Sequence, residues 1–379
     1  MHDYTIGLMS GTSLDGADGV LVDFSGQKPQ VAATASAPFD ESFRAELLAL
    51  NSPSHNELHR AALAGSQLAA VYAKVVAALV QKASAQGIAA DRIQAIGAHG
   101  QTVRHQPQRI SAEPGGAGYT IQLNNPALLA ELTGIDVVAD FRSRDVAAGG
   151  QGAPLVPAFH QCVFGRANAT VAVLNLGGIS NLSMLPPCGS SSAVLGFDCG
   201  PGNALMDAWC LQRTGQPFDA GGAWAASGRT IPALLDSLLN EPYFLQPIPK
   251  STGRDLFSTG WLAEKLQPFA SERPEDIQNT LTELTVCACA AGVSSHGKKS
   301  IELIVCGGGA FNLHLLQRLR AALPWLGVST SDQHGLPPLQ VEAAAFAWLA
   351  RQMIKRQPGN LPAVTGAAGP RVLGALYPA

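Results

Sequence analysis

A chain of 379 residues is too long for one compact core, so we expect two domains. Hydrophobic residues make up 46% of the chain and charged residues 14%, which is typical of a folded globular protein and excludes disorder. The formal net charge of -3 provides no basic surface for nucleic acid and no polybasic patch for a membrane.

The N-terminus and the cysteines predict a cytoplasmic protein. Residues 1–6 lead directly into a strand pattern and lack the charged and then apolar layout of a signal peptide. The longest apolar helical stretch, 68–80, is interrupted by Lys74 and is too short to span a bilayer. The 7 cysteines contain no C-x-x-C pair, so neither structural zinc nor a disulfide framework is expected.

The first half of the chain alternates predicted strands and helices. Strands are predicted at 5–9, 20–24, 93–98, 119–123 and 135–141. Helices are predicted at 57–85 and 126–133. This alternation, with elements of these lengths, indicates an α/β layered architecture.

The second half begins as the first half does, with a strand, a polar glycine turn and a return strand. The predicted strands are 170–174, 181–185 and 301–305. The predicted helices are 155–164, one after Pro274, 312–323 and 341–353. Two starts of the same kind suggest two similarly built lobes, which we expect to be joined by chain crossings and to enclose a cleft.

The first glycine turn, from Ser10 to Asp18, has the sequence SGTSLDGAD and lies between two predicted strands. Glycines let the backbone approach an anion closely, and the hydroxyls of Thr12 and Ser13 add donors. A carboxylate in such a turn would repel phosphate unless a cation lies between them, so Asp15 is a candidate holder of Mg²⁺. The alternative is an ordinary hairpin loop in which Asp15 and Asp18 cap the turn.

Two further glycine turns follow buried strands. The segment 175–181, NLGGISN, opens the second half, and 306–312, CGGGAFN, precedes a helix. The turn at 175–181 could hold a triphosphate. The turn at 306–312 could hold adenosine, with the phosphates near the N-terminus of the following helix. Tight packing alone would also explain either turn. For 306–312 a dinucleotide-binding site is a further alternative, although the sequence there does not match G-x-G-x-x-G. No G-x-x-x-x-G-K-[ST] motif is present.

A single acid, Asp198, follows an apolar stretch in LGFDCGPGN and precedes a turn forced by Gly200-Pro201-Gly202. A carboxylate that projects from a strand end suits a general base for a hydroxyl or a water molecule. The alternative is a turn-capping acid bonded to the amides that follow it. Asn203 is expected to cap the next helix.

Polar residues of the first half are candidates for substrate binding. An arginine fork formed by Arg142 and Arg144 would recognise a carboxylate well, although a surface salt-bridge cluster is the commoner outcome. The segment 99–105 brings His99, Gln101 and His105, which are candidates for sugar hydroxyls or, singly, for structural roles. The polar segment 250–255, KSTGRD, has no role that the sequence assigns.

These motifs together resemble a known family. The three turns are similar to the phosphate 1, phosphate 2 and adenosine signatures of the actin, sugar kinase and Hsp70 ATPase superfamily. More narrowly, four stretches resemble the anhydro-N-acetylmuramic acid kinase family: GLMSGTSLDG at 7–16, HGQT at 99–102, 140–157, and GFDCGPGN at 196–203. The resemblance continues through 305–312 and 342–349 and so covers nearly the whole chain.

The resemblance implies two ribonuclease-H-like lobes around a central cleft, the actin/hexokinase-like ATPase fold. Residues 1–160 and 341–379 would form the first lobe, with the phosphate 1 turn and the sugar-binding loops. Residues 161–340 would form the second lobe, with the phosphate 2 and adenosine turns and Asp198.

The implied activity is conversion of 1,6-anhydro-N-acetylmuramic acid, ATP and water to N-acetylmuramic acid 6-phosphate and ADP, in bacterial peptidoglycan recycling. By analogy, Asp198 is the base that activates the water molecule. ATP with Mg²⁺, the metal held by Asp15 directly or through water, would be bound by Gly11, Thr12, Ser13, Leu14, Asp15, Gly16, Ala17, Asp18, Gly177, Gly178, Gly307, Gly308, Gly309 and Asn312. The sugar would be bound by His99, Gln101, Arg142 and Arg144, with one of the two arginines at the lactyl carboxylate.

The family resemblance also implies a cytoplasmic homodimer that binds neither nucleic acid nor membrane. Two alternatives remain at this point: another amino-sugar kinase of the superfamily, and a non-enzymatic nucleotide switch like actin or Hsp70. A switch would hydrolyse ATP slowly without the sugar, whereas the kinase would need it.

Overall fold

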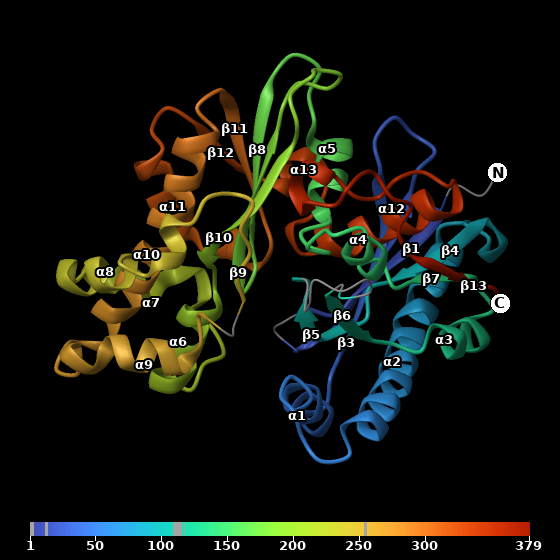
Figure 1. The fold of residues 1–379 in the computed structure, drawn as a ribbon, viewed down its shortest axis with the longest axis horizontal. Coiled ribbons are helices and arrows are strands. Elements are labelled where there is room, and N and C mark those ends of the chain that lie inside the picture. The colour runs from blue at the N-terminus through green and yellow to red at the C-terminus, as the bar shows by residue number, and fades with distance from the viewer. Residues whose placement is uncertain (1–3, 12–13, 109–115, 117, 254–255) are drawn as a thin grey trace. The chain divides into compact units, whose positions relative to one another are not determined.

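The computed structural model describes residues 4–11, 14–108, 116, 118–253 and 256–379. The chain divides into two compact units. Unit 1 contains Met1–Val163 and Gln340–Ala379, and unit 2 contains Phe164–Leu339. Each unit is built around its own sheet, and each is described separately below (Figure 1).

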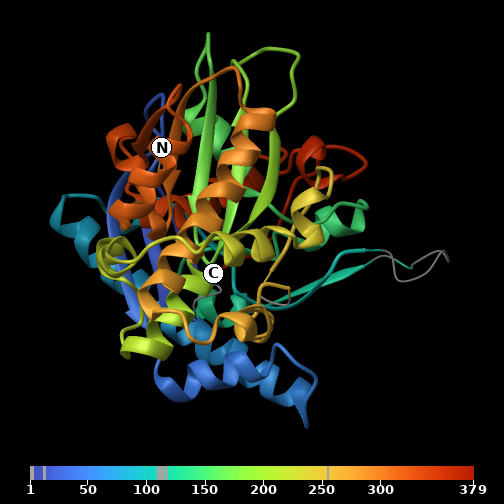
Figure 2. The same cartoon turned by 90° about the vertical axis from the view of Figure 1, so that its left-hand side faces the viewer.

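Unit 1 has a six-stranded sheet in which the central strand is the first one of the chain. β1 pairs antiparallel with β2, which pairs antiparallel with β3, whereas β4 is parallel to both β1 and β7. In sheet order the strands are β13 (Ala375–Tyr377), β7 (Val137–Ala139), β4 (Ile93–Ala98), β1 (Tyr4–Met9), β2 (Gly16–Asp23) and β3 (Gln30–Pro38). A separate hairpin, prominent in Figure 2, consists of β5 (Gln101–Gln106) and β6 (Tyr119–Leu123).

Helices cover both faces of this sheet because it is apolar on both sides. α2 (Glu57–Ala85) packs against β2 and β3, and α12 (Val341–Ile354) packs against β1 and β4. A Cβ atom on Gly7 would overlap the carbonyl oxygen of Ala343, and one on Gly97 would overlap that of Phe346. These two paired glycines therefore let α12 lie directly on the sheet.

The remaining helices of unit 1 are short and lie between the strands or after α12. They are α1 (Glu41–Ala49), η1 (Ala90–Arg92), α3 (Pro126–Thr133), α4 (Ser143–Ala147), α5 (Val156–Phe164, whose last residue belongs to unit 2) and α13 (Pro362–Thr365). Asp40 caps α1 and Asn125 caps α3, each accepting a hydrogen bond from a backbone N–H of the first turn.

Unit 2 repeats the strand order of unit 1 in its five-stranded sheet. β8, β9 and β10 form an antiparallel meander, and β11 lies parallel between β8 and β12. The strands are β10 (Leu195–Pro201), β9 (Ile179–Leu185), β8 (Thr170–Leu176), β11 (Ser300–Cys306) and β12 (Gly327–Thr330). Both sheets thus have the ribonuclease-H-like order, which confirms the predicted fold class of each lobe.

The longest helix of unit 2, α10 (Pro274–His296), supplies much of its core. Most of its side chains are buried, and it packs against β9, β10 and the helices α6, α7, α8 and α11. The other helices are α6 (Ala204–Thr214), η2 (Ala220–Gly222), α7 (Ala223–Ser227), α8 (Pro232–Leu239), η3 (Pro242–Leu245), α9 (Thr259–Leu266), η4 (Gln267–Phe269), η5 (Gly308–Phe311), α11 (Leu313–Ala322), η6 (Ser331–His334) and η7 (Pro338–Gln340, which ends in unit 1).

Most predicted elements are present, and the differences have local causes. The strand predicted at 135–141 is reduced to Val137–Ala139 because Asp140 has a left-handed backbone, with φ 58°. α2 has 29 residues and is, by length and composition alone, apolar enough to cross a membrane; its mean hydropathy over 18 residues is 1.6. The sequence prediction considered only residues 68–80, which are a shorter part of this helix. Its apolar face packs on the sheet of unit 1, as in a core helix of a soluble protein.

Candidate active site

In unit 2 the second glycine turn and the residues after Asp198 are bonded to each other. β8 ends at Leu176 and β9 begins at Ile179, so Gly177 and Gly178 form the whole turn. The backbone N–H groups of Gly202 and Asn203 donate to the carbonyl oxygens of Gly178 and Gly177, over 2.9 and 2.8 Å. A Cβ atom on Gly202 would overlap the Gly177 carbonyl, so this close approach requires glycine.

Asn203 does not cap α6 as the sequence predicted. Its side chain makes no capping hydrogen bond, and Nδ2 donates instead to the carbonyl oxygen of Leu176 over 3.0 Å. The same side chain lies beside the third turn, because a Cβ atom on Gly309 would come within 3.1 Å of Asn203 Oδ1. Asn203 therefore joins the second and third glycine turns.

The third turn starts with Gly307, whose backbone is left-handed at φ 78°. A Cβ atom there would overlap Asn175 Oδ1 and lie 2.7 Å from the Leu176 carbonyl oxygen. Gly308 is exposed and Gly309 is buried, so the backbone is accessible at one glycine and packed at the next. Gly308 and Gly309 belong to a short 3₁₀ turn, η5, and α11 begins at Leu313, one residue after the start that the sequence predicted.

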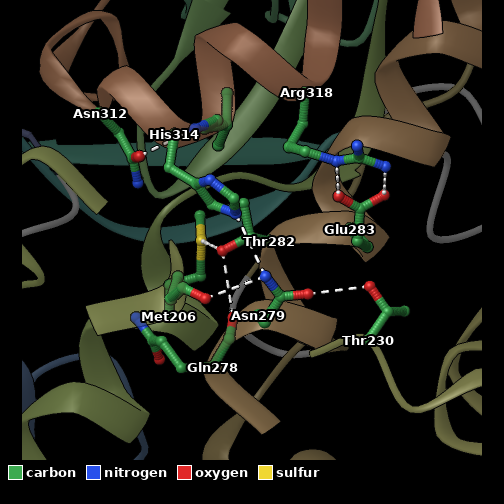
Figure 3. A network of polar contacts seen from close by, with 11 residues as sticks. Met206, Thr230, Gln278, Asn279, Thr282, Glu283, Asn312, His314 and Arg318 are labelled. Carbon is green, nitrogen blue, oxygen red and sulfur yellow. Dashed lines mark hydrogen bonds and ion pairs between the residues drawn. The ribbon is translucent and has the colours of Figure 1, made fainter. Parts of the chain in front are cut away.

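Figure 3 shows the polar network that fixes the start of α11 against α10. Asn312 Oδ1 accepts from the N–H of Leu315 and caps α11 over 3.0 Å. Asn279 Nδ2 lies 3.2 Å from Nε2 of His314, whose pKa is lowered by burial, and Asn279 Oδ1 accepts from Thr230. Arg318 forms a two-pronged ion pair with Glu283. The helix behind the third turn is thereby held by side chains from α10 and the loop before α8.

Asp198 lies within β10 rather than at its end. The pairing of β10 with β9 shifts register between Asp198 and Gly200, which is a β-bulge. Bulges re-aim side chains, and here Phe197 and Cys199 are buried on either side while Asp198 is half-buried. The carboxylate is thus the partly exposed group of an otherwise apolar stretch.

The carboxylate of Asp198 is held by a distant segment rather than by the amides that follow it. Its Oδ2 atom accepts a hydrogen bond from the backbone N–H of Thr252 over 2.9 Å. Its backbone N–H donates to the carbonyl oxygen of Lys250 over 3.1 Å. These contacts give the carboxylate a fixed orientation on β10.

In unit 1 the first glycine turn is shorter than predicted. β2 already begins at Gly16, so Gly16, Ala17 and Asp18 are strand residues and Ala17 is buried. The N–H of Leu14, which has a left-handed φ of 57°, donates to the carbonyl oxygen of Gly11 over 3.3 Å. Thr12 and Ser13 lie outside the described residues, so the structure does not bear on them.

The acids of this region influence one another. Although the surface of Asp18 is largely exposed, partial desolvation of its carboxyl raises its pKa, and the nearby Asp15 charge raises it further. Burial raises the pKa of Glu342, at the start of α12; the Arg142 charge lowers it, and the Asp18 charge raises it by a smaller amount. Glu342 was not singled out from the sequence, because an acid in the first turn of a helix is ordinarily a dipole partner.

The buried His99 and the half-buried Arg142 form a pair in unit 1. Arg142 Nε donates to His99 Nε2 over 3.0 Å, and the other ring nitrogen, Nδ1, lies 2.7 Å from the Gly100 carbonyl oxygen. Burial first, and then the Arg142 charge, lower the pKa of His99 well below its usual value. The ring is therefore neutral, with the proton on Nδ1, because arginine can only donate.

The loop that carries the two arginines is anchored to the C-terminal segment. Arg142 Nη1 donates to the carbonyl oxygen of Gly152 over 2.8 Å, and the N–H of Gly152 donates to the buried Asp145. Asp145 also accepts from the side chains of Asn360 and Thr365, over 2.6 and 2.8 Å. In contrast, Arg144 on α4 is exposed.

Two further polar residues complete the predicted set. Gln101 is buried, accepts from the Ser10 hydroxyl and donates to the Thr102 carbonyl oxygen over 3.3 Å. His105 is exposed, and its Nδ1 lies 3.0 Å from the Thr120 hydroxyl. Both residues belong to β5, but Gln101 is bonded to Ser10 next to the end of β1, whereas His105 is bonded to Thr120 within the hairpin.

Magnesium fits the donor chemistry of unit 1. No group of three or more His, Cys, Asp or Glu side chains in the described part of the chain is arranged to hold a metal ion. However, Mg²⁺ beside a nucleotide takes most of its ligands from phosphates and water and needs only one or two carboxylates. Asp15 and Asp18, whose charges repel each other, are oxygen donors of that kind.

Comparison with known proteins identifies relatives along the full length. The family model of anhydro-N-acetylmuramic acid kinase matches residues 3–379. A protein with that name from Albidiferax ferrireducens is 62% identical over 396 residues, covering 100% of both chains. Its counterpart from Variovorax paradoxus is 62% identical over 376 residues, covering 99% of this chain and 98% of the relative.

Solved structures resemble this chain only distantly. The activator of 2-hydroxyisocaproyl-CoA dehydratase from Clostridium difficile, with bound ADPNP, is 13% identical, with a TM-score of 0.45. It covers 93% of this chain, and the match spans 96% of that protein. At this level the likeness adds nothing to the strand order described above.

Proposed function

The chain belongs to the anhydro-N-acetylmuramic acid kinase family, and from this premise we infer the reaction and the residues that carry it. The protein is an ATP-dependent sugar kinase that converts 1,6-anhydro-N-acetylmuramic acid, ATP and water to N-acetylmuramic acid 6-phosphate and ADP. The observation that carries the proposed mechanism is the half-buried carboxylate of Asp198, which Thr252 orients on β10. The residues that follow this strand, Gly202 and Asn203, bond to the second glycine turn.

Asp198 is the general base of this mechanism. It takes a proton from a water molecule, whose oxygen attacks the anomeric carbon of the sugar. The bond between that carbon and O6 breaks, and O6 takes the γ-phosphoryl group of ATP as ADP leaves. The hydrogen bond from the Thr252 N–H to Oδ2 gives the carboxylate a defined orientation for this role.

The nucleotide is held by backbone groups of the glycine turns. In unit 2, Gly177 and Gly178 meet the phosphates, and Gly307, Gly308, Gly309 and Asn312 meet the adenosine; the bonds among these turns and Asn203 support this assignment. In unit 1, residues 11–15 form the phosphate turn. Gly16, Ala17 and Asp18 belong to β2, so they contribute through the position of that strand.

Mg²⁺ would be held by Asp15, directly or through water, with Asp18 and Glu342 as the neighbouring acids. When bound, the ion neutralises charge on the transferring phosphates. Asp15 is suited to this position because it is exposed at the end of the turn, where an ion can keep part of its water shell.

The sugar is recognised by the polar loops of unit 1. Both ring nitrogens of His99 have protein partners, which supports a role in positioning Arg142. Arg142 is itself bonded to Gly152, so the exposed Arg144 is the better candidate for the lactyl carboxylate. Gln101 lies next to Ser10 and links the sugar loop to the phosphate turn.

Family resemblance supports three further proposals, which concern the setting of the enzyme. We propose that it works in the cytoplasm, as a homodimer, in the recycling of peptidoglycan. Residues 1–160 with 341–379 and residues 161–340 would be its two functional lobes, the first for sugar and phosphate and the second for nucleotide and base.

Measurement of ADP formation with and without the anhydro sugar tests this function. We expect ADP only when the sugar is present, in a one-to-one ratio with phosphorylated sugar. Slow ADP formation at the same rate in both samples would contradict the kinase reaction and would favour a nucleotide switch.

A further inference from the structure

In the reaction as described so far, the polar segment that begins at Lys250 contributes only the N–H of Thr252. Its described residues lie against β10, and two backbone hydrogen bonds connect them to Asp198. One runs from the N–H of Asp198 to the Lys250 carbonyl oxygen, and the other runs from the N–H of Thr252 to Asp198 Oδ2. Residues 250–252 therefore bracket the base at its backbone and at its carboxylate.

The side chain of Lys250 ties this segment to η3. Nζ donates to the carbonyl oxygens of Tyr243 and Phe244, over 3.2 Å each, and lies 4.7 Å from the centre of the Tyr243 ring. Carbonyl oxygens near the end of a short helical turn can accept a further donor, and that of Tyr243 also accepts from the N–H of Gln246 over 3.1 Å. Removal of the ammonium would leave two of these carbonyls without that donor.

Tyr243 closes the arrangement from the other side of Asp198. Its hydroxyl donates to the Asp198 carbonyl oxygen over 2.8 Å, and its ring is buried against Phe257, with 5.7 Å between ring centres. Burial, and then the Asp198 charge, raise the pKa of Tyr243, so its hydroxyl stays protonated and remains a donor. Asp198 is thus held by Lys250, Thr252 and Tyr243, and the Lys250 ammonium joins the segments that supply all three contacts.

We propose that Lys250 is a positioning residue for Asp198: it locks η3 and the 250–252 segment together, and this fixes the orientation of the carboxylate. The inference rests on the proposed role of Asp198 as the base. A carboxylate on two rotatable bonds needs such support, because a base displaced by about 1 Å loses up to about 100-fold in rate. Lys250 itself contacts no reacting atom in this arrangement.

Lys250→Met tests the proposal because methionine keeps most of the stem and removes the ammonium. We expect kcat to fall about 10- to 100-fold, while KM for ATP and for the anhydro sugar changes less than about threefold. Lys265→Met is the matched control. Lys265 also donates to a backbone carbonyl, that of Ser237 over 3.0 Å, and lies 5.7 Å from the Trp261 ring, yet it does not bond to Asp198. Its kcat is expected to match the wild type.

A double-mutant cycle with Asp198→Asn separates positioning from a general structural effect. If Lys250 acts through the base, Lys250→Met lowers the residual turnover of Asp198→Asn by less than about twofold. An equal loss in both backgrounds would overturn the proposal. Full activity of Asp198→Asn would overturn the proposed function itself, whereas an inactive Asp198→Asn beside a fully active Lys250→Met would overturn only this inference.

Tyr243→Phe provides a second route if Lys250→Met does not fold. The ring stays, including its face toward Lys250, and only the hydrogen bond to the Asp198 carbonyl is lost. We expect kcat to fall about 2- to 10-fold, with KM unchanged, and the loss to disappear in the Asp198→Asn background. A wild-type kcat for Tyr243→Phe would contradict the arrangement.

Discussion

Replacement of Asp198 by asparagine removes the proposed base with little change in shape. The amide oxygen can still accept from the N–H of Thr252, which lies 2.9 Å from Oδ2 in the wild type. The backbone bonds to Lys250 and Tyr243 do not depend on the side chain. The variant therefore loses basicity and charge while the surrounding hydrogen bonds remain available.

The expected loss follows from general-base catalysis. Such a base contributes about 10²- to 10⁴-fold to the rate, or about 3 to 5 kcal/mol in the activation free energy. We expect kcat for sugar phosphorylation to fall by that factor and the Kd for ADP to stay within about twofold, because the glycine turns are intact. A coupled assay of ADP formation and equilibrium titration with ADP measure the two quantities.

A matched control is Asp236→Asn, which changes the same charge on an exposed position of α8. Its kcat is expected to equal that of the wild type. A kcat for Asp198→Asn within about threefold of the wild type would refute the assignment of the base. Loss of ADP binding together with kcat would show instead that Asp198 serves the fold of the glycine turns.

Three other variants test separate parts of the site. Asp15→Ala should raise the Mg²⁺ concentration needed for half-maximal activity, and an unchanged requirement would return Asp15 to a turn-capping role. Gly307→Ala should raise KM for ATP about tenfold or more and should lower the Tm more than the control Gly87→Ala does. Both glycines have left-handed backbones, but only at Gly307 would the added Cβ atom clash, against Asn175. Equal effects would contradict close packing at the turn. Glu342→Gln should raise the Tm at pH 8. The pKa of Glu342 in the folded protein lies above the ordinary 4.5, so its ionisation destabilises the fold as the pH rises. The gain in Tm should therefore vanish near pH 4, where the carboxyl is protonated in both states. A gain equal at both pH values would exclude the buried charge as its cause.

The sequence was most informative where local rules decide the structure. The helix at 57–85, the strand at 93–98 and the helix at 126–133 coincide with α2, β4 and α3, because period, Pro and Gly signals all agree there. The three glycine turns were also found, since glycine next to a buried strand has a direct physical meaning. The repeated start of the two halves anticipated the shared strand order of the sheets.

Contacts between residues far apart in the sequence could not be predicted in this way. Nothing near Asn203 in the sequence indicates that its amide binds Leu176, and the capping rule pointed elsewhere. The contact between Thr252 and Asp198 joins residues 54 positions apart and uses a backbone N–H, which carries no sequence signal. Glu342 likewise becomes notable only when α12 is placed on β1.

The edge strands of the two sheets were not predicted, because their formation also depends on residues far away in the sequence. β3, β12 and β13 are short or lie at sheet edges, and their formation depends on a neighbouring strand more than on their own composition. Asp198 was predicted at the end of a strand, but β10 continues past it through a β-bulge, so Asp198 lies in the interior of the strand. Asp198 itself was singled out from the sequence as the lone acid in an apolar run, and its role stays a prediction.

Comparison of two sugars in one assay tests the central claim most directly. The enzyme is given ATP and either 1,6-anhydro-N-acetylmuramic acid or ring-opened N-acetylmuramic acid, and ADP and sugar phosphate are measured together. The proposed mechanism predicts N-acetylmuramic acid 6-phosphate from the anhydro sugar and a background rate with the ring-opened sugar. Equal or faster phosphorylation of the ring-opened sugar would contradict hydrolytic opening by water activated at Asp198.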